Sequence, residues 1–454
     1  MITRRNFLTR AGAVAGGAAF LGQVASVEAD ERALPSPAAS AHNLSARSEN
    51  RFSDNEPPAP GQPGLDYTPV VTPDGATLPW RIVGGVKVFH LIAEEVDHEF
   101  APGLKAFCWG YNGRVHGPTI EAVEGDRVRI YVTNKLPAAT SVHWHGVILP
   151  NGMDGVGGLT QPAIKPGETF KYEFTLRQHS TNMYHSHHDE MTQMAMGLMG
   201  MFIIHPRRPR VRPDREFALL LSEWRVDVGT HRPNPNEMTD FNLLTMNARV
   251  FPGTDPMVVK KGDLVRIRIG NLSAMDHHPI HLHGHEFKIV GSEASDSDEE
   301  MIRHERLEGT VLVPVGQTRA IEFIADNPGD WAMHCHMTHH VMNQMGHKFP
   351  NMIGVKPPDD ARLREALLPG YMTMGTAGMG EMGDMGMKVP ANSLPMVGGH
   401  GPFDYITMGG MFNILKVRTS LTSYEDPGWY QHPRGEVAGI AGADELARDG
   451  IELG

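Results

Sequence analysis

The stretch EGDRVRIYVTN, residues 124–134, decides the fold class of the chain. Its Val128, Ile130 and Val132 alternate with more polar neighbours, and a period of two is typical of a strand with one buried face. GETFKYEF (167–174) alternates in the same way, and turn residues such as KPG (165–167) separate the runs. The sequence therefore predicts an all-β domain over residues 76–207.

Residues 208–357 repeat this plan. KGDLVRIRIGN (261–271) matches EGDRVRIYVTN, GQTRAIEF (316–323) matches GETFKYEF, and MNARV (246–250) matches YNGRV (111–115). Three separated matches in one order indicate an internal repeat. The chain is thus predicted to hold two copies of one β domain.

Each copy carries two His-x-His pairs. HWHG (143–146) corresponds to HLHG (281–284), and HSHH (185–188) corresponds to HCHM (334–337). In a strand such a pair directs both imidazoles to one face. One isolated pair is more often structural, whereas four pairs in register across a repeat predict metal binding. The eight histidines are His143, His145, His185, His187, His281, His283, His334 and His336.

Only the second copy adds a thiolate, in WAMHCHMTHHVMNQM (331–345). In a strand Cys335 points away from the face that carries the two flanking histidines. A thiolate with imidazoles and a distant Met is the ligand set of type 1 copper. Cys335 has His278, His340 and Met345 available in this copy. The first copy has Thr140, Ser186 and Met191 at the positions of His278, Cys335 and His340, so a single type 1 site is predicted.

HPIHLHGH (278–285), HCHMTHHVMNQM (334–345), HWHG and HSHH together resemble the four-motif signature of the multicopper oxidases, the laccase family. NGMDGVGGLTQPAIKPG (151–167) is also similar to the first domain of that family. The resemblance implies cupredoxin-like Greek-key β-sandwich domains and a copper set of one type 1, one type 2 and a type 3 pair. It implies type 1 ligation by His278, Cys335 and His340 with Met345 axial, type 2 ligation by His143 and His281, and type 3 ligation by His145, His185, His187, His283, His334 and His336.

Having two domains, the chain resembles two-domain laccases, whose ligands meet between the subunits of a homotrimer. The resemblance implies a laccase-type oxidase that reduces dioxygen to water with electrons from phenols, aromatic amines or metal ions. Cys335 would relay electrons, and Asp154 is a candidate proton donor, although an Asp before Gly is also a common turn residue. Two alternatives are a Cu(I) oxidase or copper-resistance protein and a copper nitrite reductase. The four His-x-His pairs argue against the reductase, because its catalytic centre is a single type 2 copper.

The remaining segments bear on location and partners. Residues 1–29 contain TRRNFL and a short apolar run, which predict a twin-arginine signal peptide and a periplasmic or secreted protein. Residues 30–75 are predicted to be a flexible linker. The net charge of −12 argues against a nucleic-acid partner, and no segment is apolar enough to span a membrane. Cys108 is expected to be a buried apolar residue.

An irregular C-terminal extension is predicted over 358–454. Its Met-rich part, from 371 to 390, is either disordered or a collector of Cu(I), since Met suits soft metal ions. The part around YITMGGMFNILKV (405–417) has strand character and is expected to form an arm that packs on a neighbouring subunit.

Overall fold

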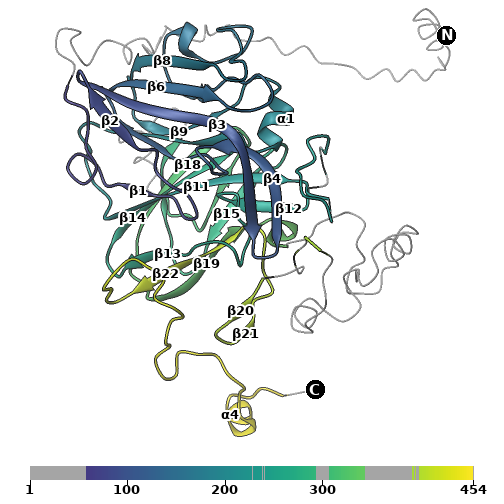
Figure 1. Ribbon diagram of the computed structural model, residues 1–454. Coiled ribbons are helices and arrows are strands. Elements are labelled where there is room, and N and C mark those ends of the chain that lie inside the picture. The colour runs from purple at the N-terminus through teal and green to yellow at the C-terminus, as the bar shows by residue number, and fades with distance from the viewer. Residues whose placement is uncertain are drawn as a thin grey trace, which may run out of the picture. The chain divides into compact units, whose positions relative to one another are not determined.

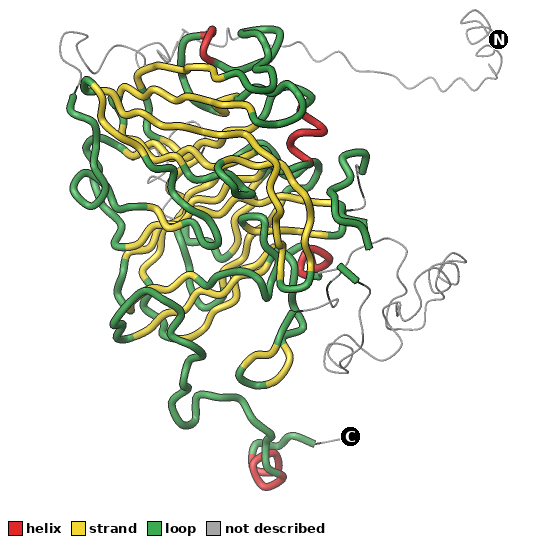
Figure 2. Tube along the Cα trace, viewed as in Figure 1, coloured by secondary structure: helices red, strands yellow, loops and turns green. Residues whose placement is uncertain are grey.

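The computed structural model describes residues 58–292 apart from 228, 238 and 240, and then 306–342, 391–392, 394 and 398–452. Strands dominate these residues, and the helices are short (Figure 2). The predicted all-β class is therefore confirmed. The predicted signal peptide and the Met-rich run at 371–390 lie outside the described residues.

The first repeat forms two sheets. One has the order β2-β3-β6-β8 with β4 paired to β3, and the other has the order β5-β10-β9-β7. The helices beside them are η3 (Asn151–Met153) and α1 (Glu190–Ala195). The strands are β2 (Trp80–Val83), β3 (Val86–Ala101), β4 (Leu104–Tyr111), β5 (Ile120–Val123), β6 (Arg127–Asn134), β7 (His143–His145), β8 (Thr169–Thr175), β9 (Ser180–His185) and β10 (Met199–His205).

The second repeat copies this topology. Its sheets have the orders β1-β11-β14-β18-β16, with β12 paired to β11, and β13-β22-β19-β15-β17. Short elements are η4 (Thr338–Val341), the pair β20 (His400–Gly401) and β21 (Asp404–Tyr405), and α4 (Ala443–Arg448). The strands are β1 (Val70–Val71), β11 (Arg215–Trp224), β12 (Leu243–Met246), β13 (Met257–Lys260), β14 (Leu264–Asn271), β15 (His278–Leu282), β16 (Lys288–Ser292), β17 (Thr310–Val313), β18 (Thr318–Ile324), β19 (Gly329–Cys335) and β22 (Phe412–Arg418).

The second repeat extends past its predicted end at residue 357. In the first repeat β10 lies between β5 and β9. In the second repeat β22 takes the same place between β13 and β19, which Figure 1 labels. The strand character predicted for 405–417 holds for the part in β22, whereas residues 406–411 are not in a strand. The expectation of an arm on a neighbouring subunit is not met for β22, because the strand pairs with both neighbours inside its own chain.

Each repeat has its own core. Along β6 the apolar residues Val128, Ile130 and Val132 are fully buried, while the residues between them are more exposed, as the alternation predicted. A further apolar cluster joins the repeats and includes Met199 and Met201 of the first repeat with Ala218 and Leu220 of the second. Cys108 is buried and free, as expected.

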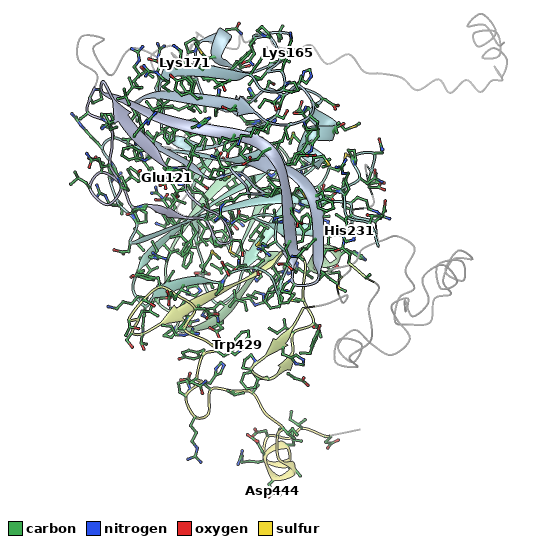
Figure 3. The ribbon with its side chains drawn as sticks, in the orientation of Figure 1. Glu121, Lys165, Lys171, His231, Trp429 and Asp444 are labelled. Atoms are coloured by element: carbon green, nitrogen blue, oxygen red, sulfur yellow. The ribbon has the colours of Figure 1, made fainter. Side chains whose placement is uncertain are left out.

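Buried polar residues also lie between strands of the two repeats. His205 on β10 bonds Glu121 on β5 at 3.0 Å, and its other ring nitrogen lies 4.0 Å from Glu216 on β11 (Figure 3). His116 Nε2 lies 2.8 Å from the Ser222 hydroxyl, and His98 Nε2–H donates to the carbonyl oxygen of Ala248 at 2.7 Å. Polar contacts therefore fix how the repeats meet.

These buried histidines predict sensitivity to acid. Burial lowers the pKa of His98 to about 4 and that of His116 to about 3, from an ordinary value of 6.5. The unfolded chain therefore takes up these protons at a higher pH than the folded protein does. We expect the free energy of unfolding of the metal-free protein to be largest above pH 6.5 and to fall steadily toward pH 4, as measured by urea titration.

His98→Gln keeps an amide that can donate to the Ala248 carbonyl but does not titrate, so this variant should lose less stability between pH 7 and pH 4. His90→Gln is the control, because His90 is exposed. A pH profile of His98→Gln as steep as that of the wild type would contradict the assignment.

Candidate metal centres

Three of the residues predicted to bind type 1 copper converge in the core of the second repeat. His278 begins β15, Cys335 ends β19, and His340 lies in η4. The Cys335 sulfur is 3.7 Å from Nδ1 of His278 and 3.4 Å from Nδ1 of His340, and the two nitrogens are 3.2 Å apart. All three side chains are buried. One sulfur and two imidazole nitrogens around a common point fit the donor set of a blue copper site.

Polar side chains contact Nε2 of His278 and of His340, the ring nitrogens that face away from Cys335. His278 Nε2 lies 2.7 Å from Ser273 Oγ, and His340 Nε2 lies 3.3 Å from a carboxylate oxygen of Asp276. A Glu223 carboxylate oxygen is 3.8 Å from His278 Nε2. These contacts leave Nδ1 of both rings facing Cys335, which is the orientation that metal binding requires.

Burial also sets the protonation of this trio. It raises the pKa of the Cys335 thiol to about 12. It lowers the pKa of His278 to about 3, with a smaller contribution from His340. The pKa of His340 is lowered by burial too, and the Asp276 carboxylate opposes that shift. Both imidazoles are therefore neutral at pH 7, and the thiol has to lose its proton when a metal binds.

The other eight predicted ligands form two quartets, one in each repeat. Strand pairing places His143 opposite His185 and His281 opposite His334. Within each quartet neighbouring rings have centroids between 4.7 and 6.0 Å apart, and among the described residues no ring of one quartet contacts a ring of the other. The first quartet is His143, His145, His185 and His187, and the second is His281, His283, His334 and His336.

Backbone carbonyl oxygens fix the tautomer of four of these rings, two in each quartet. In every case Nδ1–H donates to a carbonyl oxygen, so Nε2 is the nitrogen available to a metal. The bonds run from His143 to Asp154 (2.8 Å), from His281 to Gly309 (2.6 Å), from His185 to Ser186 (2.9 Å) and from His334 to Cys335 (2.9 Å). His185 and His334 occupy equivalent positions in the two repeats, and both bond the carbonyl oxygen of the next residue at the same distance. The two repeats therefore orient these rings in the same way.

Acidic side chains accompany the first quartet. A carboxylate oxygen of Asp154 lies 3.4 Å from His143 Nδ1, so this predicted residue does reach the histidines. Glu190, which sequence reasoning missed, lies 3.6 Å from His185 Nδ1 and 3.7 Å from His187 Nε2. A cavity of about 490 Å³ is lined by the quartet, by Glu190 and by residues of the second repeat that include Gly316.

The first repeat has replaced the type 1 trio with a neutral hydrogen-bonded one. The hydroxyls of Thr140 and Ser186 both donate to Gln193 Oε1, at 2.7 and 2.6 Å, and all three side chains are buried. Sequence comparison had paired Met191 with His340, but Met191 is 62% exposed and Gln193 lies with Ser186 instead. The position that Cys335 occupies in the second repeat is thus part of a hydrogen-bonded polar cluster in the first repeat.

Other predicted features are easily placed. Met345 lies outside the described residues.

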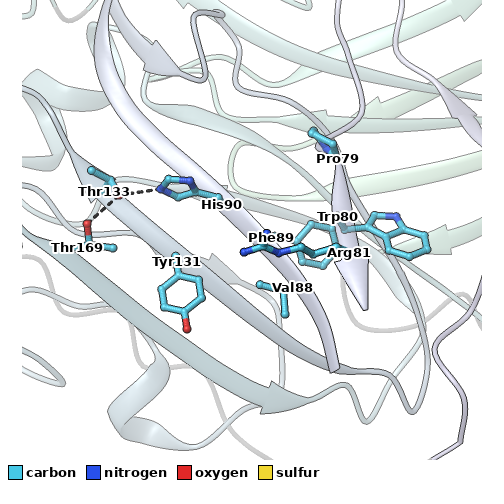
Figure 4. A pocket seen from close by; sticks show the side chains of 9 residues that line it. All are labelled: Pro79, Trp80, Arg81, Val88, Phe89, His90, Tyr131, Thr133 and Thr169. Atoms are coloured by element: carbon cyan, nitrogen blue, oxygen red, sulfur yellow. Dashed lines mark hydrogen bonds between the residues drawn. The ribbon is translucent and has the colours of Figure 1, made fainter. Parts of the chain in front are cut away.

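A separate hollow on β2, β3 and β6 is lined by Trp80, His90 and Tyr131 among others, and none of the predicted copper ligands lines it (Figure 4). Among the described residues, none of the helices has the length and apolar character that crossing a bilayer requires.

Comparison with known sequences gives one consistent family. Two multicopper oxidase family models match residues 93–209 and 227–354. The chain is 40% identical over 123 residues to copper resistance protein A of Pseudomonas syringae pv. tomato, covering 27% of this chain and 20% of that protein. It is 41% identical over 140 residues to L-ascorbate oxidase of Brassica rapa, covering 29% and 24%. The chain spans about a fifth to a third of the length of the curated relatives it matches.

Solved structures agree on the fold. A multicopper oxidase called mgLAC is 26% identical with a TM-score of 0.53, covering 74% of this chain and 87% of that one. The blue copper oxidase of Nitrosomonas europaea is 29% identical with a TM-score of 0.50, covering 64% and 96%. The two family models cover more than half of the chain, including the His-x-His pairs and Cys335, and the chain therefore belongs to the multicopper oxidases.

Proposed function

We propose that this protein is a laccase-like, copper-dependent oxidase that takes single electrons from a small reductant and passes four of them to dioxygen, which becomes two molecules of water. One observation supports this above all. Cys335 belongs to the buried trio, while its neighbours His334 and His336 belong to the second quartet, in which His283 and His336 are exposed. A metal store for several electrons would thus be joined to a separate entry site.

Copper bound at these residues would supply one-electron transfer at His278, Cys335 and His340 and dioxygen reduction at the quartets, with the type 2 and type 3 assignments given by the family resemblance. The protein supplies the path between them. The Cys335 main chain connects directly to His334 and His336, and the hydrogen bond from His334 Nδ1 to the Cys335 carbonyl oxygen adds a second route. Four quartet rings are already oriented by hydrogen bonds from Nδ1 to a carbonyl oxygen, so little has to rearrange when copper is loaded.

Replacing Cys335 tests this assignment. Cys335→Ser should abolish the blue band, because a hydroxyl cannot supply the copper–thiolate bond, and should leave the quartets able to bind copper. The measurements are the visible and EPR spectra of the copper-loaded proteins, together with oxygen uptake driven by a phenol or by Cu(I). In the wild type the band should bleach under anaerobic reduction and return with oxygen. A blue Cys335→Ser protein would refute the proposal.

We assign proton delivery to Asp154, because its carboxylate lies beside His143 at the first quartet. Asp154→Asn keeps the size and the backbone carbonyl that holds His143 but cannot carry the proton. It should retain the wild-type EPR spectrum, reduce turnover by about 10²–10⁴-fold as expected for a lost general acid, and alter the solvent isotope effect on oxygen uptake. Wild-type turnover in a fully loaded variant would exclude the role.

We also propose that the two quartets meet between subunits of a homotrimer. Each quartet is only half of the predicted ligand set, the quartets have no ring contact with each other among the described residues, and His283 and His336 are exposed. In a closed ring of three, the first repeat of one subunit can face the second repeat of the next.

Mixing variants distinguishes this arrangement from one within a single chain. His145→Ala disables the first quartet and His283→Ala the second. Oligomers that contain both kinds of subunit should regain oxygen uptake, because some interfaces combine two intact quartets. A mixture of His145→Ala with His187→Ala is the control and should stay inactive. Mixed trimers of the first kind that remain inactive, or a fully active monomer, would overturn the proposal.

The reducing substrate is proposed as a class: phenols, aromatic amines or metal ions. The similarity to copper resistance protein A favours Cu(I) as one member of that class, and the oxygen-uptake assay with Cu(I) tests it. The twin-arginine motif in residues 1–29 supports export of the protein to the periplasm or out of the cell. Changing TRRNFL to TKKNFL should keep the protein in the cytoplasmic fraction, as measured by cell fractionation.

A further inference from the structure

We propose that the axial ligand of the type 1 copper is Met411, which immediately precedes β22, and not Met345, which the family resemblance implied. The inference rests on the proposed type 1 site and adds a ligand from a segment far along the chain. Blue copper sites take a weak axial thioether in addition to the thiolate and two imidazoles. The following contacts show why Met411 fits that role.

Strand pairing places Met411 directly across from Cys335. In the pairing of β19 with β22, His334 is opposite Phe412, and the next step brings Cys335 opposite Met411. The Cys335 N–H donates to the Met411 carbonyl oxygen at 3.1 Å. Residues directly opposed in an antiparallel pair direct their side chains to the same face, with Cβ atoms about 4.5–5.5 Å apart. Both side chains are fully buried, in one apolar cluster.

A second contact ties Met411 to the other end of the site. Its N–H donates to the carbonyl oxygen of His340 at 2.9 Å. The preceding Gly410 has a φ of +59°, and a Cβ there would lie 2.4 Å from that same carbonyl oxygen. The main chain therefore approaches η4 as closely as glycine permits. Met411 is thus fixed by hydrogen bonds to two of the three converging ligands.

The internal repeat supplies an independent argument. In the first repeat the Ser186 N–H donates to the Leu198 carbonyl oxygen at 3.0 Å, so Leu198 is the counterpart of Met411. Ser186 stands where Cys335 stands in the second repeat. The repeat with a thiol therefore has a thioether opposite it, and the repeat with a hydroxyl has a hydrocarbon. A core requirement alone would be met by Leu in both places.

Two substitutions at Met411 test the proposal in opposite directions. Met411→Leu removes an electron donor from Cu(II) and should raise the reduction potential of the blue site. Met411→Gln offers a harder oxygen ligand and should lower that potential and change the EPR spectrum toward a more tetragonal site. Both are measured by redox titration of the blue band and by EPR on the copper-loaded protein, so turnover is not needed. Met345→Leu is the matched control and should keep the wild-type potential and spectrum.

The possible outcomes distinguish an error in the Met411 assignment from an error in the proposed function. Opposite shifts from the two Met411 variants, with no shift from Met345→Leu, support the assignment. Unchanged spectra in both Met411 variants, or an equal shift from Met345→Leu, overturn it while leaving the type 1 site in place. A wild-type protein that binds copper without any blue band would instead refute the proposed function itself.

Discussion

The pairing of β19 with β15 and β22 is the constraint on which the metal-binding architecture depends. Because side chains alternate along a strand, the end of β19 can direct Cys335 inward and its two histidine neighbours outward. β15 does the same on one side, with His278 buried and His281 more exposed. β22 closes the other side. These paired strands therefore create an inner and an outer donor set, and η4 adds His340 to the inner one.

The two repeats show how one scaffold serves two purposes. Buried polar groups are costly unless they are bonded. In the first repeat Gln193 satisfies two hydroxyls, and that site needs no metal. In the second repeat the neutral imidazoles and the protonated thiol contact one another, and a metal can replace the thiol proton. Folding of the second repeat thus tolerates the empty ligand set, while copper binding stabilises it.

Much of this was predictable from local sequence. The alternation around Val128 predicted the strands, and the matched segments predicted the internal repeat. The His-x-His pairs predicted which histidines cluster in each repeat. Two kinds of error have physical causes. Counting residues paired His340 with Met191, but α1 and η4 follow different paths after β9 and β19, so Gln193 lies with Ser186. The pairing of β22 with β19 joins residues far apart in the chain, and no local pattern reveals such a partner.

The position of β22 has one more consequence. Val341 and Gly409 lie far apart in the sequence but next to each other in the second sandwich, where the Gly409 N–H donates to the Val341 carbonyl oxygen at 2.7 Å. Because the two ends are already held together, lengthening the segment between them costs only a slowly growing closure entropy. Evolution can therefore add, remove or exchange chain at this point without disturbing the sandwich. Such an insertion is anchored next to His340, so the same fold can acquire new surfaces beside the buried trio of His278, Cys335 and His340.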